Sequence, residues 1–150
     1  MKVQVLQRIA LVSALAVAGC GSHGSKPVPV ACKEGPGPIR AALARAPARV
    51  ELGGTPLSGC LTRGAEPADV QQVGAAYVSV AAELAEVARG KPEGQEALRL
   101  GYLVAAARRG AGGTQGIHDE LIRRIEQETN GVDTGSAAYR RGYRAGRDHG

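Results

Sequence analysis

The sequence predicts an all-α protein: a small helical bundle of about four helices, preceded by an irregular N-terminal region. Apolar residues recur at helical spacing over much of the chain, and proline, glycine and charged residues mark where helices begin and end. The chain has 150 residues, of which 43% are hydrophobic, so a single domain is expected. Because it contains four Tyr but no Phe or Trp, its core is expected to consist mainly of aliphatic side chains.

Residues 67–89 carry the strongest helical pattern. Pro67 suits the first position of a helix, and Gly90 suits the position after its end. Apolar side chains between them follow one another at alternating spacings of three and four residues, which is typical of helices that pack side by side. These side chains are Val70, Val73, Tyr77, Val80, Leu84 and Val87.

Two shorter helices are expected to follow. The first begins near Pro92 and ends at Gly110, with glutamates in its first turn and arginines in its last. The second is expected to start after Thr114, whose hydroxyl suits an N-cap, and to end at Asn130 and Gly131. The short turns between these helices favour antiparallel neighbours in a bundle.

A last, basic helix is expected over residues 136–149, with Asp133 or Ser136 as its N-cap. Small residues share one side of this helix and arginines share the other. Each glycine costs about 1 kcal/mol relative to alanine in a helix, so the segment must either dock on the bundle or be ordered by a partner. The small residues are Ala138, Gly142, Ala145 and Gly146, and the opposite arginines are Arg140, Arg144 and Arg147.

The region before residue 67 shows weaker patterns. A short helix is expected over residues 38–47, beginning at Pro38. Residues 49–52 have some strand character, and glycines stop the strand. The rest of residues 48–65 is expected to be an irregular connection.

Residues 1–20 have the pattern of an export signal. Lys2 and Arg8 form a basic lead, and residues 9–18 are an uncharged apolar run. A stable membrane-spanning helix needs about 20 apolar residues, so this run is too short to be one. A basic lead, a short apolar run and small residues after it are typical of a signal peptide.

The end of this signal, Val17-Ala18-Gly19-Cys20, resembles the lipobox of bacterial lipoprotein precursors. The resemblance implies that the Cys20 thiol receives a diacylglycerol and that residues 1–19 are then removed. Each buried CH₂ of an acyl chain, such as palmitate, contributes about 0.8 kcal/mol, so two or three chains hold a protein firmly at a membrane. We therefore expect an extracytoplasmic, lipid-anchored protein of a bacterial membrane, which is the outer membrane if the cell is Gram-negative.

The rest of the chain is expected to divide in two. Residues 20–31 form the lipid anchor and a flexible polar tether, and residues 32–150 form the helical domain. With Cys20 lipidated, Cys32 and Cys60 remain, and an even remainder in an exported chain predicts one disulfide. Export also separates the chain from ATP, reduced nicotinamide and glutathione, which excludes kinases, dehydrogenases and thioredoxins. No cofactor is expected.

Lys2 and Arg8 of the expected signal carry two of the five net positive charges, and the other three are concentrated at one place. Acidic and basic side chains balance over residues 20–136, so the surplus lies in Arg140, Arg141, Arg144 and Arg147. Guanidinium groups suit phosphate and other anions. We expect this face to contact a lipid headgroup, an anionic envelope polymer or an acidic partner protein, and the alternative is a solvated helix face. Nucleic acid is not expected outside the cytoplasm.

His118, Asp119 and Glu120 form the densest group of titratable side chains. Consecutive helical residues diverge by about 100°, so these three do not converge on one substrate. Ile122 stands where a second zinc-binding histidine would be needed, and no metal site is expected. The two carboxylates are accounted for by their position in the first turn of a helix, where the positive end of the helix dipole stabilises negative charge.

These observations favour a non-catalytic structural or interaction module of the cell envelope. The alternative is an envelope hydrolase or polymer-modifying enzyme in which His118 acts with Asp119 or Glu120. A buried cleft around His118 would favour the enzyme, whereas a solvent-exposed His118 would favour the interaction module.

Overall fold

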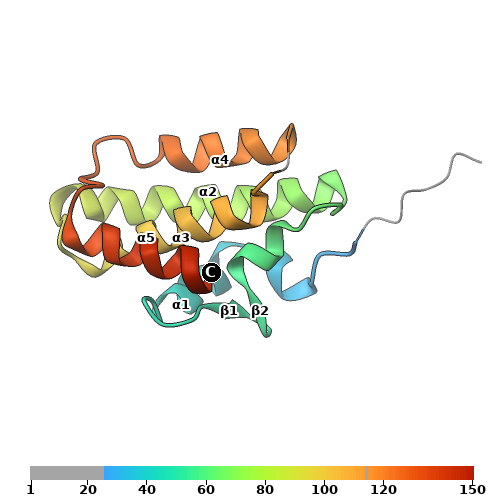
Figure 1. Ribbon diagram of the computed structural model, residues 1–150, viewed down its shortest axis with the longest axis horizontal. Helices are drawn as coiled ribbons and strands as arrows, with labels where there is room; N and C mark the ends of the chain where they lie inside the picture. The colour runs from blue at the N-terminus through green and yellow to red at the C-terminus, as the bar shows by residue number, and fades with distance from the viewer. Residues whose placement is uncertain (1–25, 114) are drawn as a thin grey trace, which may run out of the picture.

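The computed structural model describes residues 26–113 and 115–150, most of which lie in helices (Figure 1). The prediction of a mainly helical bundle is confirmed. The helices within these ranges are α1 (Pro36–Leu43), α2 (Pro67–Gly90), α3 (Gln95–Ala111), α4 (Ile117–Gln127) and α5 (Ala137–His149), with two short 3₁₀ helices, η1 (Val30–Lys33) and η2 (Leu57–Leu61).

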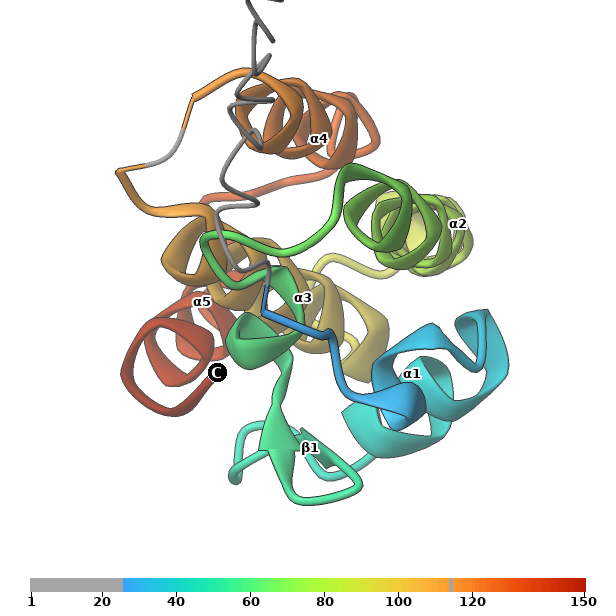
Figure 2. The same cartoon turned by 90° about the vertical axis from the view of Figure 1, so that its right-hand side faces the viewer.

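Helix α3 is the centre of the bundle. Seen end-on, it lies between α2, α4 and α5, with the N-terminal region below it (Figure 2). Every residue from Leu100 to Ala107 is buried. A helix that is apolar on all sides requires neighbours on all sides, and the surrounding elements provide them.

Helix α5 packs on α3 with the two backbones in close approach. A Cβ atom added at Gly142 would lie closer than 3.0 Å to the carbonyl oxygen of Leu98, and one added at Gly146 would lie as close to that of Tyr102. The face of small residues expected from the sequence is therefore the face that docks on α3. Of the two alternatives for this helix, docking on the bundle is the one the structure has.

The start of α5 is held by two side chains. Ser136, rather than Asp133, is the N-cap, and its hydroxyl accepts a hydrogen bond from the N–H of the third helical residue at 3.2 Å. The Glu93 carboxylate accepts hydrogen bonds from the backbone N–H groups of Ala137 and Ala138, both at 3.0 Å. A carboxylate at this position also favours the positive end of the helix dipole.

Helix α3 begins at Gln95, later than the start near Pro92 that the sequence predicts. Residues 91–94 form a turn, in which the Gly94 N–H donates to the Lys91 carbonyl oxygen at 2.9 Å. The turn leaves the Glu93 side chain free to reach α5, and this contact cannot be read from local sequence.

The other end of α5 is also tied down. The Ser58 hydroxyl donates to the backbone carbonyl oxygen of Gly150 at 2.5 Å. The Arg109 guanidinium donates to the carbonyl oxygen of Arg147 at 2.5 Å. These bonds satisfy carbonyl groups that the end of a helix leaves without partners.

A disulfide joins the two 3₁₀ helices of the N-terminal region. Cys32 in η1 and Cys60 in η2 are linked, with their Cα atoms 5.6 Å apart, so the predicted pairing is confirmed. Between them, β1 (Glu51–Leu52) and β2 (Thr55–Pro56) form a two-stranded antiparallel hairpin. The expected strand is therefore present but shorter than predicted, and η2 gives regular structure to part of the expected irregular connection.

The N-terminal region is attached to the helices by buried tyrosine hydroxyls. The Tyr77 hydroxyl on α2 donates to the Leu57 carbonyl oxygen at 2.7 Å. The Tyr102 hydroxyl on α3 accepts from the Val50 N–H at 3.0 Å. Burial raises the pKa of both phenols, so they stay neutral and the two bonds persist at neutral pH.

The flexible tether predicted for residues 20–31 does not extend to residue 31. The Lys26 N–H donates to the Gly64 carbonyl oxygen at 2.8 Å, and Val28 lies in the core with 3% of its surface exposed. The prolines on both sides of Val28 restrict the backbone, and burial of the valine side chain stabilises its docking. The predicted lipidation site, Cys20, lies outside the described residues.

Within residues 26–113 and 115–150, none of the helices combines the length and the apolar character needed to cross a bilayer. Helix α2 is long enough, but its exposed side carries charged residues such as Glu83 and Glu86.

Candidate anion-binding site

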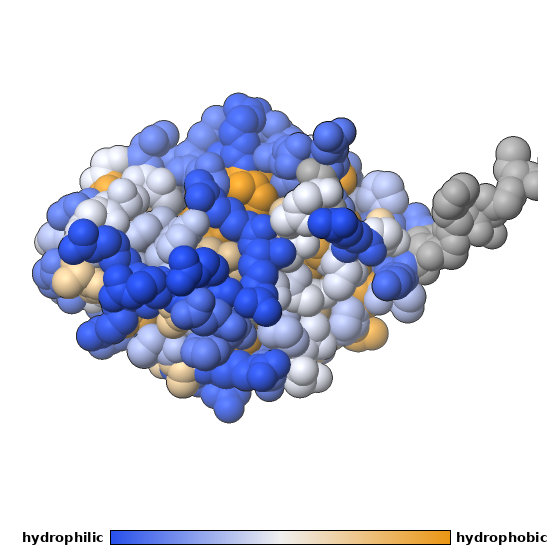
Figure 3. Space-filling model, in the orientation of Figure 1, coloured by the Kyte–Doolittle hydropathy of each residue, from blue (hydrophilic) through white to orange (hydrophobic). Residues whose placement is uncertain are grey.

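The four arginines of α5 do not form one group. Arg140 and Arg144, one helical turn apart, line a pocket of about 510 Å³ where α3, α4 and α5 meet. Arg141 and Arg147 do not line it, and Arg147 pairs with Asp148 at 3.2 Å. Hydrophilic side chains gather over the part of the surface that α5 occupies (Figure 3).

The rest of the pocket comes from segments far apart in the sequence. Helix α3 supplies an apolar residue and an arginine, the end of α4 and the connection to α5 supply polar side chains, and α5 adds two tyrosines. These lining residues are Val104, Arg108, Glu126, Thr129, Thr134, Tyr139 and Tyr143.

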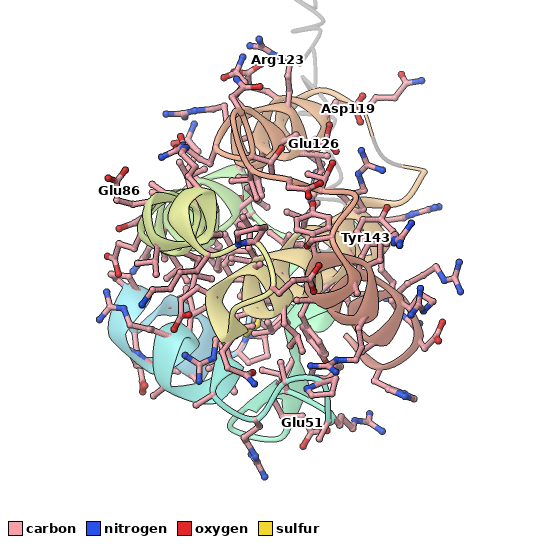
Figure 4. All side chains as sticks on the ribbon, turned by 90° about the vertical axis from the view of Figure 1, so that its left-hand side faces the viewer. Glu51, Glu86, Asp119, Arg123, Glu126 and Tyr143 are labelled. Carbon is pink, nitrogen blue, oxygen red and sulfur yellow. A yellow bond between two sulfur atoms is a disulfide. The ribbon has the colours of Figure 1, made fainter. Side chains whose placement is uncertain are left out.

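Arg108 links the three helices at the pocket. Its Nε donates to Glu126 Oε1 on α4 at 2.5 Å, and its Nη1 donates to the Tyr143 hydroxyl on α5 at 2.9 Å. The guanidinium carbon also lies 5.9 Å from the centre of the Tyr143 ring. Figure 4 shows Glu126 and Tyr143 on these two neighbouring helices. The hydrogen bond to Glu126 is the main reason that the pKa of Arg108 is raised, so this residue stays charged.

Sequence reasoning missed Arg108 as a site residue. Arg108 stands near the end of α3, where the negative end of the helix dipole stabilises a cation. This local role is sufficient to account for an arginine there. The contact with Glu126 and Tyr143 depends on how α3, α4 and α5 pack. No spacing pattern within one segment could have revealed it.

Arg140, Arg144 and Arg108 are all exposed, but Arg140 and Arg144 differ from Arg108 because neither forms an ion pair within the described part of the chain. The pocket thus holds three guanidinium groups and the single carboxylate of Glu126, which leaves two positive charges. Two free guanidinium groups on one wall can donate charge-assisted hydrogen bonds to an anion.

Two tyrosine rings stand beside these arginines. The ring centres of Tyr139 and Tyr143 are 6.3 Å apart with an angle of 22° between their planes. Burial raises the pKa of Tyr139 to about 12, so its phenol is neutral at physiological pH. The Tyr139 ring therefore gives the pocket an uncharged surface next to its cations.

His118 is neither solvent-exposed nor part of this pocket. It lies in the first turn of α4 with 6% of its surface exposed, and its Nε2 is buried without a hydrogen-bond partner among the described residues. The Glu120 carboxylate accepts from Arg123 Nη2 at 2.6 Å instead. Asp119 is exposed on the same helix. The structure thus does not gather His118, Asp119 and Glu120 around a shared cleft.

Within the described residues, no group of three or more His, Cys, Asp or Glu side chains could hold a metal ion. Comparison with known proteins adds no constraint on the site: no protein-family model, no curated protein and no solved structure matches this chain.

Proposed function

We propose that this protein is a lipid-anchored, extracytoplasmic binding module of a bacterial cell envelope, and that its basic pocket binds an anionic envelope component. The anchor rests on the resemblance of residues 17–20 to a lipobox. The Cys32–Cys60 disulfide supports an oxidising compartment outside the cytoplasm. The observation that carries the binding role is the pair of unpaired arginines, Arg140 and Arg144, on the pocket wall.

Unlike Arg140 and Arg144, several other arginines of the chain form ion pairs. Arg40 on α1 pairs with a glutamate of α2, and Arg89, Arg99 and Arg123 pair with glutamates three residues before them. Like charges one turn apart on a helix destabilise it by about 0.2–0.5 kcal/mol. A bound anion would remove this repulsion, which is a physical reason for the pocket to bind one.

The enzymatic alternative has weaker support. It requires His118 to act with Asp119 or Glu120 on a substrate, and the residues that line the basic pocket include none of these three. A binding role needs only the arginines and the walls that hold them in place.

Charge reversal tests the binding role with a matched control. The unacylated chain, made with Cys20→Ala, is incubated with vesicles of phosphatidylcholine alone or mixed with phosphatidylglycerol, at low and high salt. Arg140→Glu with Arg144→Glu should abolish salt-sensitive binding. Arg141→Glu with Arg147→Glu makes the same change in net charge outside the pocket and should retain most of it.

Equal losses in the two double variants would mean that binding follows net charge rather than the pocket. Unchanged binding in the pocket variant would contradict the proposed role. The anchor has its own test, the intact mass of the protein purified from membranes of its native host. Acyl mass on Cys20 is expected, and an unmodified chain cut elsewhere would contradict the anchor.

A further inference from the structure

We propose that the pocket is a discrete site for a phosphorylated organic molecule of about the size of a sugar or polyol phosphate, with its phosphoryl group held between Arg140 and Arg144. This inference rests on the proposed anion binding and goes further by naming the class of ligand. Three properties of the pocket carry it: its volume, the charge left unmatched on its wall, and the mixed chemistry of its other residues.

The volume is too large for a bare anion. At about 510 Å³ the pocket falls within the range of about 300–1,000 Å³ that is typical of sites for organic ligands. Water occupies about 30 Å³ per molecule in the liquid, so an inorganic ion with a few waters would leave most of the pocket to solvent. A ligand that fills it must carry an organic part beside its charged group.

The unmatched charge fits a phosphoryl group. Arg140 and Arg144 lie one turn apart on the same wall, and the pocket as a whole has two positive charges in excess. A phosphomonoester carries about −1.5 to −2 at neutral pH and has three oxygens that accept hydrogen bonds. Two guanidinium groups can share these oxygens, whereas a single carboxylate would leave one positive charge unmatched.

Glu126 does not prevent anion binding, because its charge is already compensated. Its carboxylate accepts the hydrogen bond from Arg108 Nε, and Arg108 is further fixed by the Tyr143 hydroxyl. Arg108 is therefore a positioning residue that holds α4 and α5 on α3. The ligand-binding cations are the two arginines without an ion pair, Arg140 and Arg144.

The remaining walls suit an organic group that bears hydroxyls. Val104 and Tyr139 are 2% and 6% exposed and form an apolar surface. Thr129 and Thr134 add hydroxyl groups, and Thr129 Oγ1 donates to the Glu126 carbonyl oxygen at 2.7 Å, so its lone pairs remain available as acceptors. An apolar surface combined with a few polar groups is the usual composition of a small-molecule site.

A phosphoryl group has two sources: a soluble sugar or polyol phosphate, which is the proposed phosphomonoester, or a lipid headgroup such as that of phosphatidylglycerol, which is a phosphodiester with one negative charge. The unacylated chain is titrated by calorimetry with inorganic phosphate, glucose 6-phosphate, glycerol 3-phosphate and glucuronate. Its binding to phosphatidylglycerol vesicles is then measured with and without the tighter phosphate ester. Competition by the ester identifies the headgroup as a second ligand of the same site, and binding of the ester alone identifies the soluble source.

We expect a phosphate ester to bind at least about tenfold more tightly than inorganic phosphate, because only the ester contacts the apolar and hydroxyl walls. Arg140→Ala and Arg144→Ala should each weaken ester binding about tenfold or more, since each removes charge-assisted hydrogen bonds. Arg141→Ala is the matched control on the same helix and should bind as the unmodified chain does. Thr134→Val should weaken binding of the ester and leave inorganic phosphate unchanged. Circular dichroism confirms that each variant is folded.

Inorganic phosphate that binds as tightly as both esters would overturn this inference, because the organic part would then contribute nothing. Glucuronate that binds as tightly as glucose 6-phosphate would overturn the assignment to phosphate. Pocket-dependent vesicle binding without binding of either ester would also overturn it, while leaving the proposed function intact. The binding role in the proposed function fails instead if the vesicle experiment does not distinguish the two double variants.

Discussion

Replacing Gly142 with alanine should destabilise the protein, although alanine is the better helix former. In an exposed helix the same change would stabilise the helix by about 1 kcal/mol. At Gly142, however, the new carbon would lie closer than 3.0 Å to the carbonyl oxygen of Leu98. That oxygen belongs to the backbone of a buried helix, so it cannot rotate away as a flexible side chain could. Helices α3 and α5 would have to separate.

The size of the effect follows from two opposing contributions. Overpacking a well-packed interior costs about 1–3 kcal/mol, and a clash between backbones lies at the upper end of that range. The gain in helix propensity offsets about 1 kcal/mol of this strain. We therefore expect the free energy of unfolding to fall by about 2 kcal/mol for Gly142→Ala.

Urea unfolding followed by far-ultraviolet circular dichroism measures this difference. Gly90→Ala, at the end of α2, is the control. A Cβ atom added there would have no atom within 4 Å apart from its chain neighbours and the backbone of its own helix. The control should be as stable as the unmodified protein or slightly more stable. A Gly142→Ala variant that is no less stable than the unmodified protein would refute the close approach of α3 and α5.

Three further predictions concern other contacts. Glu93→Ala should lower the free energy of unfolding by about 1–2 kcal/mol, because the first N–H groups of α5 lose their acceptor; faster amide exchange confined to α5 would confirm the cause. Joint replacement of Cys32 and Cys60 by serine should cost about 3–4 kcal/mol in urea unfolding, and an unchanged midpoint would contradict this. Stability should also fall from pH 10 towards pH 12, because the unfolded chain releases its tyrosine protons near the ordinary pKa of 10, whereas burial raises the folded pKa of Tyr139 to about 12 and also raises those of Tyr77 and Tyr102. Tyr139→Phe should make this decline less steep, and an unchanged slope would contradict the burial of this phenol.

Much of the fold could be predicted because local residues determine it. Helix α2 begins at Pro67 as expected and ends at Gly90, one residue later than predicted, since proline and glycine act on the backbone where they stand. The contact of Glu93 with the start of α5 could not be predicted, because it joins residues more than forty positions apart in the chain. The sequence places Val28 in the tether for a similar reason: its polar, proline-rich neighbours give no sign of the core that covers it.

The candidate site could be predicted only in part. Helical periodicity places Arg140, Arg144 and Arg147 on one face, and the surplus charge of the segment is enough to propose anion binding. Periodicity does not separate Arg147 from the other two, because it does not show where a pocket lies. Arg108 joins the site through the packing of three helices, which is a property of the tertiary structure.

The glycines that allow α5 to dock on α3 have a second consequence. Because the pocket needs the docked helix, ligand binding reports whether the chain has folded completely. Alone, a segment with Gly142 and Gly146 in its interior has little tendency to be helical. The wall that carries Arg140 and Arg144 therefore exists only after α5 has docked. A chain in which this segment has not yet docked would present arginines but no pocket. Conversely, a ligand that binds only the docked form would raise the melting temperature, by an amount that grows with the logarithm of its free concentration relative to its Kd. Thermal shift therefore offers a direct screen for the anion.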